Sequence, residues 1–339
     1  MATRRLFPAA LGLCALALAG AAAALAAAAA GDEAADGIVK VADWQVEGHF
    51  IQDEDMSGLA CDGAGTCVAA SDETTGVQVF HVKDRRIVAD VYVDLLASHG
   101  EIDIEGLALA GDYFYAAGSH GASRKKAEIQ PNRYKIVRVP VAVAAAVRAA
   151  GTGEVDAYGK AEVATLHDFI KSNPTLGPYA DVRLQRNGVN IEGLAVKDGK
   201  LYAGFRGPSI DGRAAVLVVD EAQLFGGSWP DPVLRQVRLG RGIGIRDLVA
   251  TADGFLILSG DAGVKQHDGH ASRFELGHAA RLHLWDGSSE DAIVLGSLRG
   301  GSGDAEGLLL LDEDDEGYRV LVVHDGVGGG APVEYRVSR

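Results

Sequence analysis

Short apolar runs alternate along this chain with turns rich in Gly and Asp, and several runs alternate apolar and polar residues with a period of two. Runs of this kind, rich in β-branched and aromatic residues, are typical of β-strands. One frame occurs five times: a polar residue, an apolar residue, a variable residue, and then Gly-Leu-Ala or a variant. The five copies are DMSGLACD from Asp55, DIEGLALAGD from Asp103, NIEGLAVKDG from Asn190, GIRDLVATADG from Gly244 and DAEGLLLLDED from Asp304.

Each copy of the frame begins a unit of several strands. A second and a third apolar run follow every copy, and a fourth run can be read in the first four units. The fifth unit reaches the end of the chain with three runs, whereas GIVKVADWQVEG, residues 37–48, alternates before the first unit. If this segment pairs with the last unit, the chain makes a closed ring of five four-stranded sheets, which is a β-propeller.

We therefore predict an all-β fold, a β-propeller of five four-stranded blades closed by an N-terminal strand that pairs with the C-terminal blade. The frames lie 48, 87, 54 and 60 residues apart. The interval of 87 residues could contain a sixth blade, and this alternative stays possible. A solenoid, in which the sheets do not close into a ring, is the competing architecture. Residues 140–189 are predicted to form an insertion with an Ala-rich helix and a loop. The fourth strand of the second unit is read in AEVATLHDFI, residues 161–170.

The first 30 residues carry a targeting pattern. Arg4 and Arg5 precede a long Ala-rich apolar run that ends in small residues, as in a cleaved signal peptide. We predict a signal peptide at 1–30, a short linker at 31–36 and one propeller domain at 37–339, with export by the Sec or the twin-arginine route left open. The mature protein is expected to be soluble, periplasmic or extracellular, and without a membrane span.

The cysteines and the net charge limit the compartment and the partners. Cys61 and Cys67 flank a Gly-rich turn, and in an oxidising compartment this arrangement predicts a disulfide across a hairpin. The net charge of −15 argues against nucleic acid as a partner. No Walker loop, GxGxxG fingerprint or haem motif occurs, so no organic cofactor is indicated. We expect a monomer.

Carboxylates recur at the start of the first strand in each unit. Strands of a blade are antiparallel, so these residues and those at the ends of the second strands should meet at one mouth of the central channel. Oxygen ligands suit Ca²⁺ or Mg²⁺. The predicted metal ligands are Asp103, Glu105, Glu192, Asp304 and Glu306. In the alternative interpretation, which stays open, each Glu caps backbone amides of the neighbouring blade.

Basic and imidazole side chains occur at the same predicted mouth. They could hold an anionic group such as phosphate or carboxylate and move a proton. The predicted substrate-binding residues are Ser119, Arg124, Lys125, Arg206 and Arg246, and the predicted catalytic residues are His120, Glu192 and His324. A solvated basic loop that balances nearby acids is the alternative for the stretch around Arg124.

Four stretches together resemble one family. GVNIEGLAVKDGKLYAGFRGPSIDGRAAVLVV, GIRDLVATADGFLILSG, DIEGLALAGDYFYAAGSH and DAEGLLLL followed by YRVLVVHDG are similar to the bacterial domain of unknown function 3616, from about Asp53 to the end of the chain. No established activity comes with this family. A distant similarity to propellers named for an esterase-like activity of phytase implies a secreted hydrolase, although a shared fold does not supply chemistry.

Two functions follow as hypotheses. In the first, the chain is a metal-assisted hydrolase of phosphoesters or other anionic esters at the channel mouth. In the second, it is a non-catalytic propeller that binds a small polar or anionic molecule, or a partner in the cell envelope, at the same place.

Overall fold

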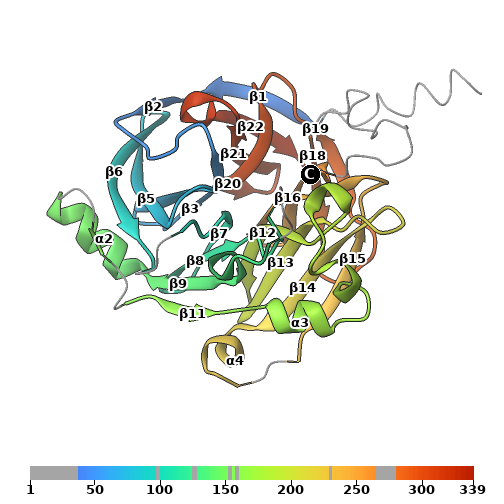
Figure 1. The fold of residues 1–339 in the computed structure, drawn as a ribbon. Helices are drawn as coiled ribbons and strands as arrows, with labels where there is room; N and C mark the ends of the chain where they lie inside the picture. Colours follow the sequence, from blue (N-terminus) through green and yellow to red (C-terminus); the bar gives the residue numbers. More distant parts are fainter. Residues whose placement is uncertain are drawn as a thin grey trace, which may run out of the picture. The chain divides into compact units, whose positions relative to one another are not determined.

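The computed structural model describes residues 37–96, 100–123, 128–151, 155–156, 160–228, 231–263 and 280–339. The chain divides into two units, residues 1–36 and 37–339, and the described residues all belong to the second. They form five sheets arranged as the blades of a β-propeller, which confirms the predicted fold and blade number (Figure 1). Within the described ranges, no helix is long and apolar enough to cross a membrane.

Each blade has four main strands, and in the first four blades these follow chain order from the axis outward. Blade one contains β3 (Met56–Cys61), β4 (Cys67–Ser71), β5 (Gly76–Lys83) and β6 (Arg86–Asp94), with the short β2 (Gln45–Glu47) and β10 (Val155–Asp156) added parallel to β6. Blade two contains β7 (Ile104–Ala110), β8 (Tyr113–Gly118), β9 (Ile136–Pro140) and β11 (Glu162–Ala164). Blade three contains β12 (Asn190–Lys197), β13 (Lys200–Gly207), β14 (Arg213–Asp220) and β15 (Val233–Arg238).

The remaining two blades complete the ring. Blade four contains β16 (Ile243–Thr251), β17 (Gly254–Asp261), β18 (Arg281–Trp285) and β19 (Ile293–Ser297). Blade five contains β20 (Asp304–Asp314), β21 (Gly317–Asp325), β22 (Val333–Ser338) and, from the other end of the domain, β1 (Ile38–Asp43). The innermost strands β3, β7, β12, β16 and β20 contact one another in that order, and β20 returns to β3. This arrangement surrounds a central channel.

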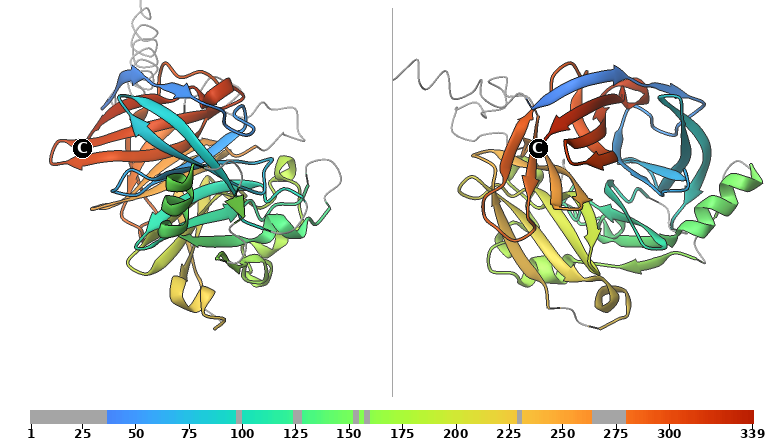
Figure 2. Two further views of the ribbon diagram at one scale, coloured as in Figure 1. Left: turned by 90° about the vertical axis from the view of Figure 1, so that its left-hand side faces the viewer. Right: turned by 180° about the vertical axis from the view of Figure 1, so that it is seen from behind.

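The predicted ring closure is confirmed. β1 pairs antiparallel with β22, with Ile38 opposite Val337 and Asp43 opposite Val333, and Figure 2 shows β1, in blue, along the red C-terminal blade. A buried ion-pair cluster reinforces the closure around Glu334 of β22, whose side chain is 1% exposed. Its carboxylate accepts hydrogen bonds from Trp44 Nε1 at 2.9 Å, from Arg85 Nε at 3.0 Å and from Arg319 at 2.7 Å.

Helices occur mainly in the long connection after β9. The helices and 3₁₀ turns are α2 (Val141–Ala150), α3 (His167–Ser172), α4 (Glu221–Phe225), η1 (Pro131–Tyr134), η2 (Gly177–Tyr179), η3 (Leu184–Arg186) and η4 (Gly328–Gly330). The prediction of one strand over 161–170 was wrong beyond Ala164, because the chain there enters α3. Leu166, Phe169 and Ile170 are buried together in the core between blades two and three, and their spacing of i, i+3 and i+4 is that of a helix.

Apolar side chains between neighbouring blades form the core. The described residues contain five hydrophobic clusters, one at each blade-to-blade contact. The first and second strands of blade three are joined by a tight turn. In blade three, Asp198 and Gly199 adopt φ angles of 51° and 70°, which is the conformation that an Asp-Gly hairpin turn supplies.

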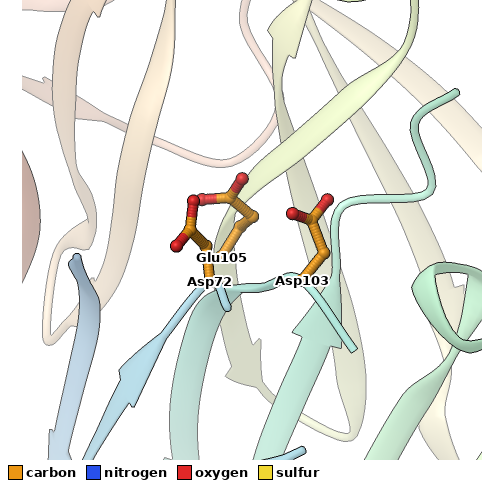
Figure 3. Close-up of side chains that lie close together, drawn as sticks. All are labelled: Asp72, Asp103 and Glu105. Atoms are coloured by element: carbon orange, nitrogen blue, oxygen red, sulfur yellow. The ribbon is translucent and has the colours of Figure 1, made fainter. Parts of the chain in front are cut away.

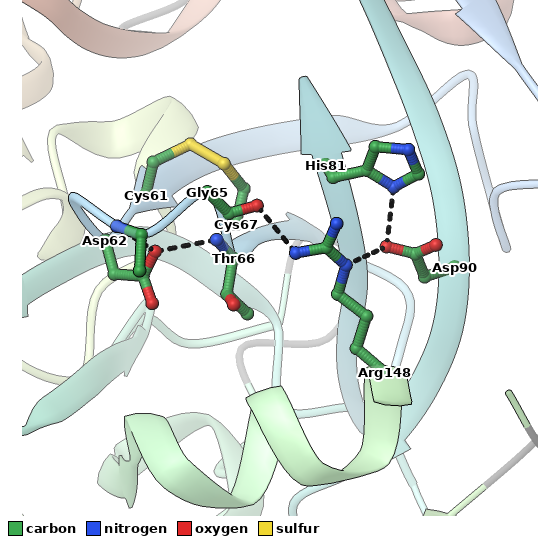
Figure 4. The surroundings of a disulfide bond; sticks show 9 residues. Cys61, Asp62, Gly65, Thr66, Cys67, His81, Asp90 and Arg148 are labelled. Carbon is green, nitrogen blue, oxygen red and sulfur yellow. Dashed lines mark hydrogen bonds and ion pairs between the residues drawn. A yellow bond between two sulfur atoms is a disulfide. The ribbon is translucent and has the colours of Figure 1, made fainter. Parts of the chain in front are cut away.

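The predicted disulfide between Cys61 and Cys67 is present and joins the end of β3 to the start of β4. Figure 4 shows its surroundings. Arg148 of α2 donates to the carbonyl oxygen of Gly65 in the disulfide loop at 3.0 Å and pairs with Asp90 of β6 at 3.0 Å. The helix of the insertion is thereby attached to blade one, at the end of the channel opposite the polar starts of the inner strands.

Candidate functional site

The variable residue of the repeated frame lies at a β-bulge in every blade. The register between the first and second strands shifts at this residue in all five sheets. The five residues are Ser57, Glu105, Glu192, Arg246 and Glu306. A bulge re-aims a side chain, and the bulges occur near the starts of the innermost strands. They account for a ring of polar side chains at one mouth of the channel.

The glycine that follows the variable residue is required by close packing between inner strands. A Cβ on Gly106 would lie 2.9 Å from Leu194 Cβ, and a Cβ on Gly193 would lie 2.9 Å from Leu248 Cβ. In blade four Asp247 stands in this position, and its carboxylate accepts hydrogen bonds from the amides of Leu248 and Leu308, each at 2.7 Å. Asp247 therefore caps the backbone of the neighbouring blade, a role predicted as the alternative for the glutamates.

Two of the three ring glutamates are held by arginines. Arg206 binds Glu192 Oε1 at 2.8 Å, and Arg246 Nε binds Glu192 Oε2 at 3.2 Å. Arg246 also pairs with Glu306, and Asn190 Nδ2 donates to Glu192 Oε1 at 2.7 Å. Burial and the nearby charge of Arg206 lower the pKa of Arg246. These contacts link blades three, four and five across the mouth.

Glu105 of blade two has a different environment from the other two glutamates. Its side chain is buried at 6% exposure, and no other described residue makes a hydrogen bond or ion pair with it. One carboxylate oxygen each of Asp72, Asp103 and Glu105 lies within 4.8 Å of the others. Burial raises the pKa of Glu105 well above its ordinary value, the charges of Glu192, Asp103 and Asp72 raise it further, and the charge of Arg206 lowers it in part.

The three acids come from neighbouring blades, as Figure 3 shows. Asp72 follows β4 of blade one, whereas Asp103 and Glu105 lie at the start of β7 in blade two. Asp103 has a φ angle of 58°. Ser119 donates to its carboxylate, and Arg133 pairs with it at 3.0 Å. The acid cluster, defined as Asp72, Asp103 and Glu105, therefore has one member that the surrounding chain holds in place from two sides.

The two histidines predicted to move protons are both buried. His120 places Nδ1 2.8 Å from the carbonyl oxygen of Gly118, and its Nε2 accepts a hydrogen bond from the amide of Leu166 at 3.1 Å. Burial lowers the pKa of His120 to about 4. His324 has Nδ1 3.1 Å from the carbonyl oxygen of Ala331, and burial lowers its pKa also. Both rings are therefore neutral near pH 7.

The structure brings together only part of the predicted site. Asp103 and Glu105 lie close together in the acid cluster. Glu192 and Glu306 form ion pairs with arginines instead. Asp304 is exposed at the start of β20. Ser119, Arg206 and Arg246 have the partners given above, while Arg124 and Lys125 lie outside the described residues. Asp72 was not among the predicted metal ligands. Its position at the end of a second strand, equivalent to Ser119 and Arg206, was the available signal.

Comparison with known proteins gives a family and a set of distant folds. No curated protein matches the chain. Among solved structures it is similar to the allergen Mala s 1 of Malassezia sympodialis (10% identity, TM-score 0.46, covering 85% of this chain and 94% of that one) and to the WD40 β-propeller domain of Doa1 (13%, 0.36, 90% and 98%). It is also similar to virginiamycin B lyase from Staphylococcus aureus (9%, 0.39, 86% and 69%). The family model of the protein of unknown function DUF3616 matches residues 55–330, and the chain belongs to this family.

Proposed function

We propose that the channel mouth binds a divalent cation, Ca²⁺ or Mg²⁺, at the acid cluster, and that the chain uses the ion to hydrolyse a phosphoester or another anionic ester. The observation that supports this proposal is Glu105, a buried carboxylate beside two further carboxylates and without a described protein partner. Burial of an unpaired charge is costly, and a hard cation with oxygen ligands offsets that cost.

The rest of the mouth supports a role for Glu105 that differs from that of Glu192 and Glu306. Arg206 and Arg246 neutralise those two glutamates, so the excess negative charge is concentrated on the acid cluster. Ser119 and Arg133 hold the Asp103 carboxylate in one orientation. A bound ion would supply a Lewis acid and lower the pKa of a coordinated water. His324, neutral near pH 7, is our candidate to accept a proton.

Ion binding is tested by calorimetric titration of the mature chain with CaCl₂ and MgCl₂ after treatment with a chelator. We expect saturable binding by the wild type and its loss in Glu105→Gln. Glu54→Gln is the matched control, because Glu54 is an exposed acid in the loop that enters β3 at the same face. Equal binding by wild type and Glu105→Gln would contradict the site.

Hydrolysis is tested separately with p-nitrophenyl phosphate and p-nitrophenyl acetate, with each ion and with excess EDTA. Turnover that needs the ion and is lost in Glu105→Gln supports the enzyme. A second candidate function is non-catalytic binding of a small polar or anionic ligand through the ion. The engagement of Arg206, Arg246 and His120 with protein partners favours it. Ion binding without turnover of either ester would favour this second function.

A further inference from the structure

The channel becomes apolar two residues along each inner strand from the polar ring. There the leucine of every repeated frame lines a cavity of about 170 Å³ between the five blades. These residues are Leu59, Leu107, Leu194, Leu248 and Leu308. Toward the opposite face the walls continue with Cys61, Leu109, Val196, Ala250 and Leu310. None of these lining side chains carries a charge, and the wall consists of their apolar atoms together with backbone groups of the inner strands. The cavity therefore offers an uncharged surface to a ring.

The hairpins that begin directly beyond this lining carry a strong excess of negative charge. Segments 61–66, 110–112, 197–200, 251–254 and 311–317 contain nine acidic residues and two lysines. The acids are Asp62, Asp112, Asp198, Asp253, Asp312, Glu313, Asp314, Asp315 and Glu316, and the lysines are Lys197 and Lys200. Asp residues are common in turns for conformational reasons, but the resulting field still acts on any ligand that enters.

Positive groups offset only part of this field. Arg339 pairs with Asp253, Arg336 pairs with Asp314 and Glu316, and Lys197 donates to backbone carbonyl oxygens of blade four. Asp112 and Asp198 are exposed, and neither has an ion-pair partner among the described residues. The apolar end of the channel therefore opens among carboxylates that remain available to a cation.

Size and charge together identify the class of ligand. An apolar protein cavity of about 150 Å³ binds benzene, so the present cavity accommodates one aromatic ring. We infer that this end of the channel binds a small aromatic cation, with its ring between the side chains of Leu109, Val196, Ala250 and Leu310 and its ammonium or amidinium group among the aspartates of the turns. This site is independent of the proposed ion site, because the two lie at opposite ends of the inner strands.

The inference is tested by titration of the mature chain with benzylamine, benzyl alcohol and benzoate, which share a ring and differ in charge. We expect saturable binding of benzylamine, at least tenfold tighter than benzoate, with benzyl alcohol between them. Absence of saturable benzylamine binding, or benzoate binding of equal strength, would overturn the inference.

Two sets of variants locate the ligand. Ala250→Phe fills the cavity and should weaken benzylamine binding at least tenfold, whereas Ala142→Phe, on an exposed position of α2, should leave it unchanged. The double variant Asp112→Asn with Asp198→Asn changes only exposed turn residues. It should reduce the preference for benzylamine over benzoate at least threefold, and an unchanged preference would refute the charge argument even if Ala250→Phe failed to fold.

Discussion

Replacement of Glu105 by glutamine should have opposite effects on stability with and without a divalent cation. In the ion-free protein Glu105 is buried beside Asp72, Asp103 and Glu192 without a described partner. Glutamine keeps the shape of the side chain but removes the charge that burial and these acids oppose, and roughly one or two pKa units of such opposition correspond to about 1–3 kcal/mol. At pH 7.5 in EDTA we therefore expect Glu105→Gln to unfold about 2–6 °C above the wild type, with roughly 2 °C per kcal/mol for a domain of this size.

The cation should reverse that order. A ligand present at a hundred times its dissociation constant stabilises the folded state by about 2.7 kcal/mol. CaCl₂ or MgCl₂ at such a concentration should raise the melting temperature of the wild type by about 5 °C and leave that of Glu105→Gln unchanged. Thermal unfolding followed by circular dichroism measures both effects, with Glu54→Gln as the control that should behave as the wild type.

The pH dependence in EDTA provides a further check on the same residue. Because the pKa of Glu105 is raised in the folded state, the folded protein binds more protons than the unfolded chain between the ordinary and the raised pKa. Stability of the ion-free wild type should therefore fall as pH rises through this interval, and Glu105→Gln should lack this component. A lower melting temperature of Glu105→Gln in EDTA would show that the carboxylate is a structural partner and would refute the reasoning.

Three further perturbations test the framework around the site. Glu334→Gln weakens the ion pairs with Arg85 and Arg319 and should destabilise the protein by about 1–3 kcal/mol in urea unfolding. The loss is limited because both arginines are half-exposed. Although burial opposes it, hydrogen bonds from Trp44 and Arg319 lower the pKa of Glu334, so this contribution should be present at neutral pH and lost as pH falls through the lowered pKa. Arg246→Met leaves the buried Glu192 with Arg206 alone and the half-buried Glu306 without its arginine, and should cost about 3 kcal/mol. Arg246→Met with Glu306→Gln should recover part of that loss. Cys61→Ser opens a loop with a sequence separation of 6 and should cost about 2 kcal/mol; a change below 0.5 kcal/mol would argue against a role in stability.

The architecture could be predicted because it depends on patterns that repeat along the chain. Strand periodicity, the five frames and the alternating segment before the first frame specify the blades and their closure, and β1 pairs with β22 as expected. The outer edge of blade two was harder to predict, since a run such as residues 161–170 fits a strand or a helix. The burial of Phe169 and Ile170 against blade three favours the helix. This contact is between distant parts of the chain, so the local sequence does not reveal it.

The pairing of the ring carboxylates could be predicted only in part, because their partners come from other strands and other blades. Glu105 and Glu192 share the local sequence Ile-Glu-Gly-Leu-Ala, yet Glu192 binds two arginines and Glu105 lies among acids. One signal was available two residues earlier in the frame. Asn190 donates to Glu192, whereas the equivalent Asp103 adds a second negative charge beside Glu105.

The departure from fivefold symmetry at the mouth is best explained by the charges that each blade contributes. In blades two and three, packing between the inner strands leaves no room for a Cβ after the variable position, and Gly106 and Gly193 meet that demand in the same way. Packing does not demand a carboxylate at the variable position, because Ser57 fits blade one and donates to the carbonyl oxygen of Ile104 at 2.5 Å. A serine at position 105 would avoid the cost of burying a third acid beside Asp72 and Asp103. Residues that reduce stability and that packing does not require are expected at functional sites. Among the five ring residues, Glu105 is therefore the one that a bound ligand would best explain.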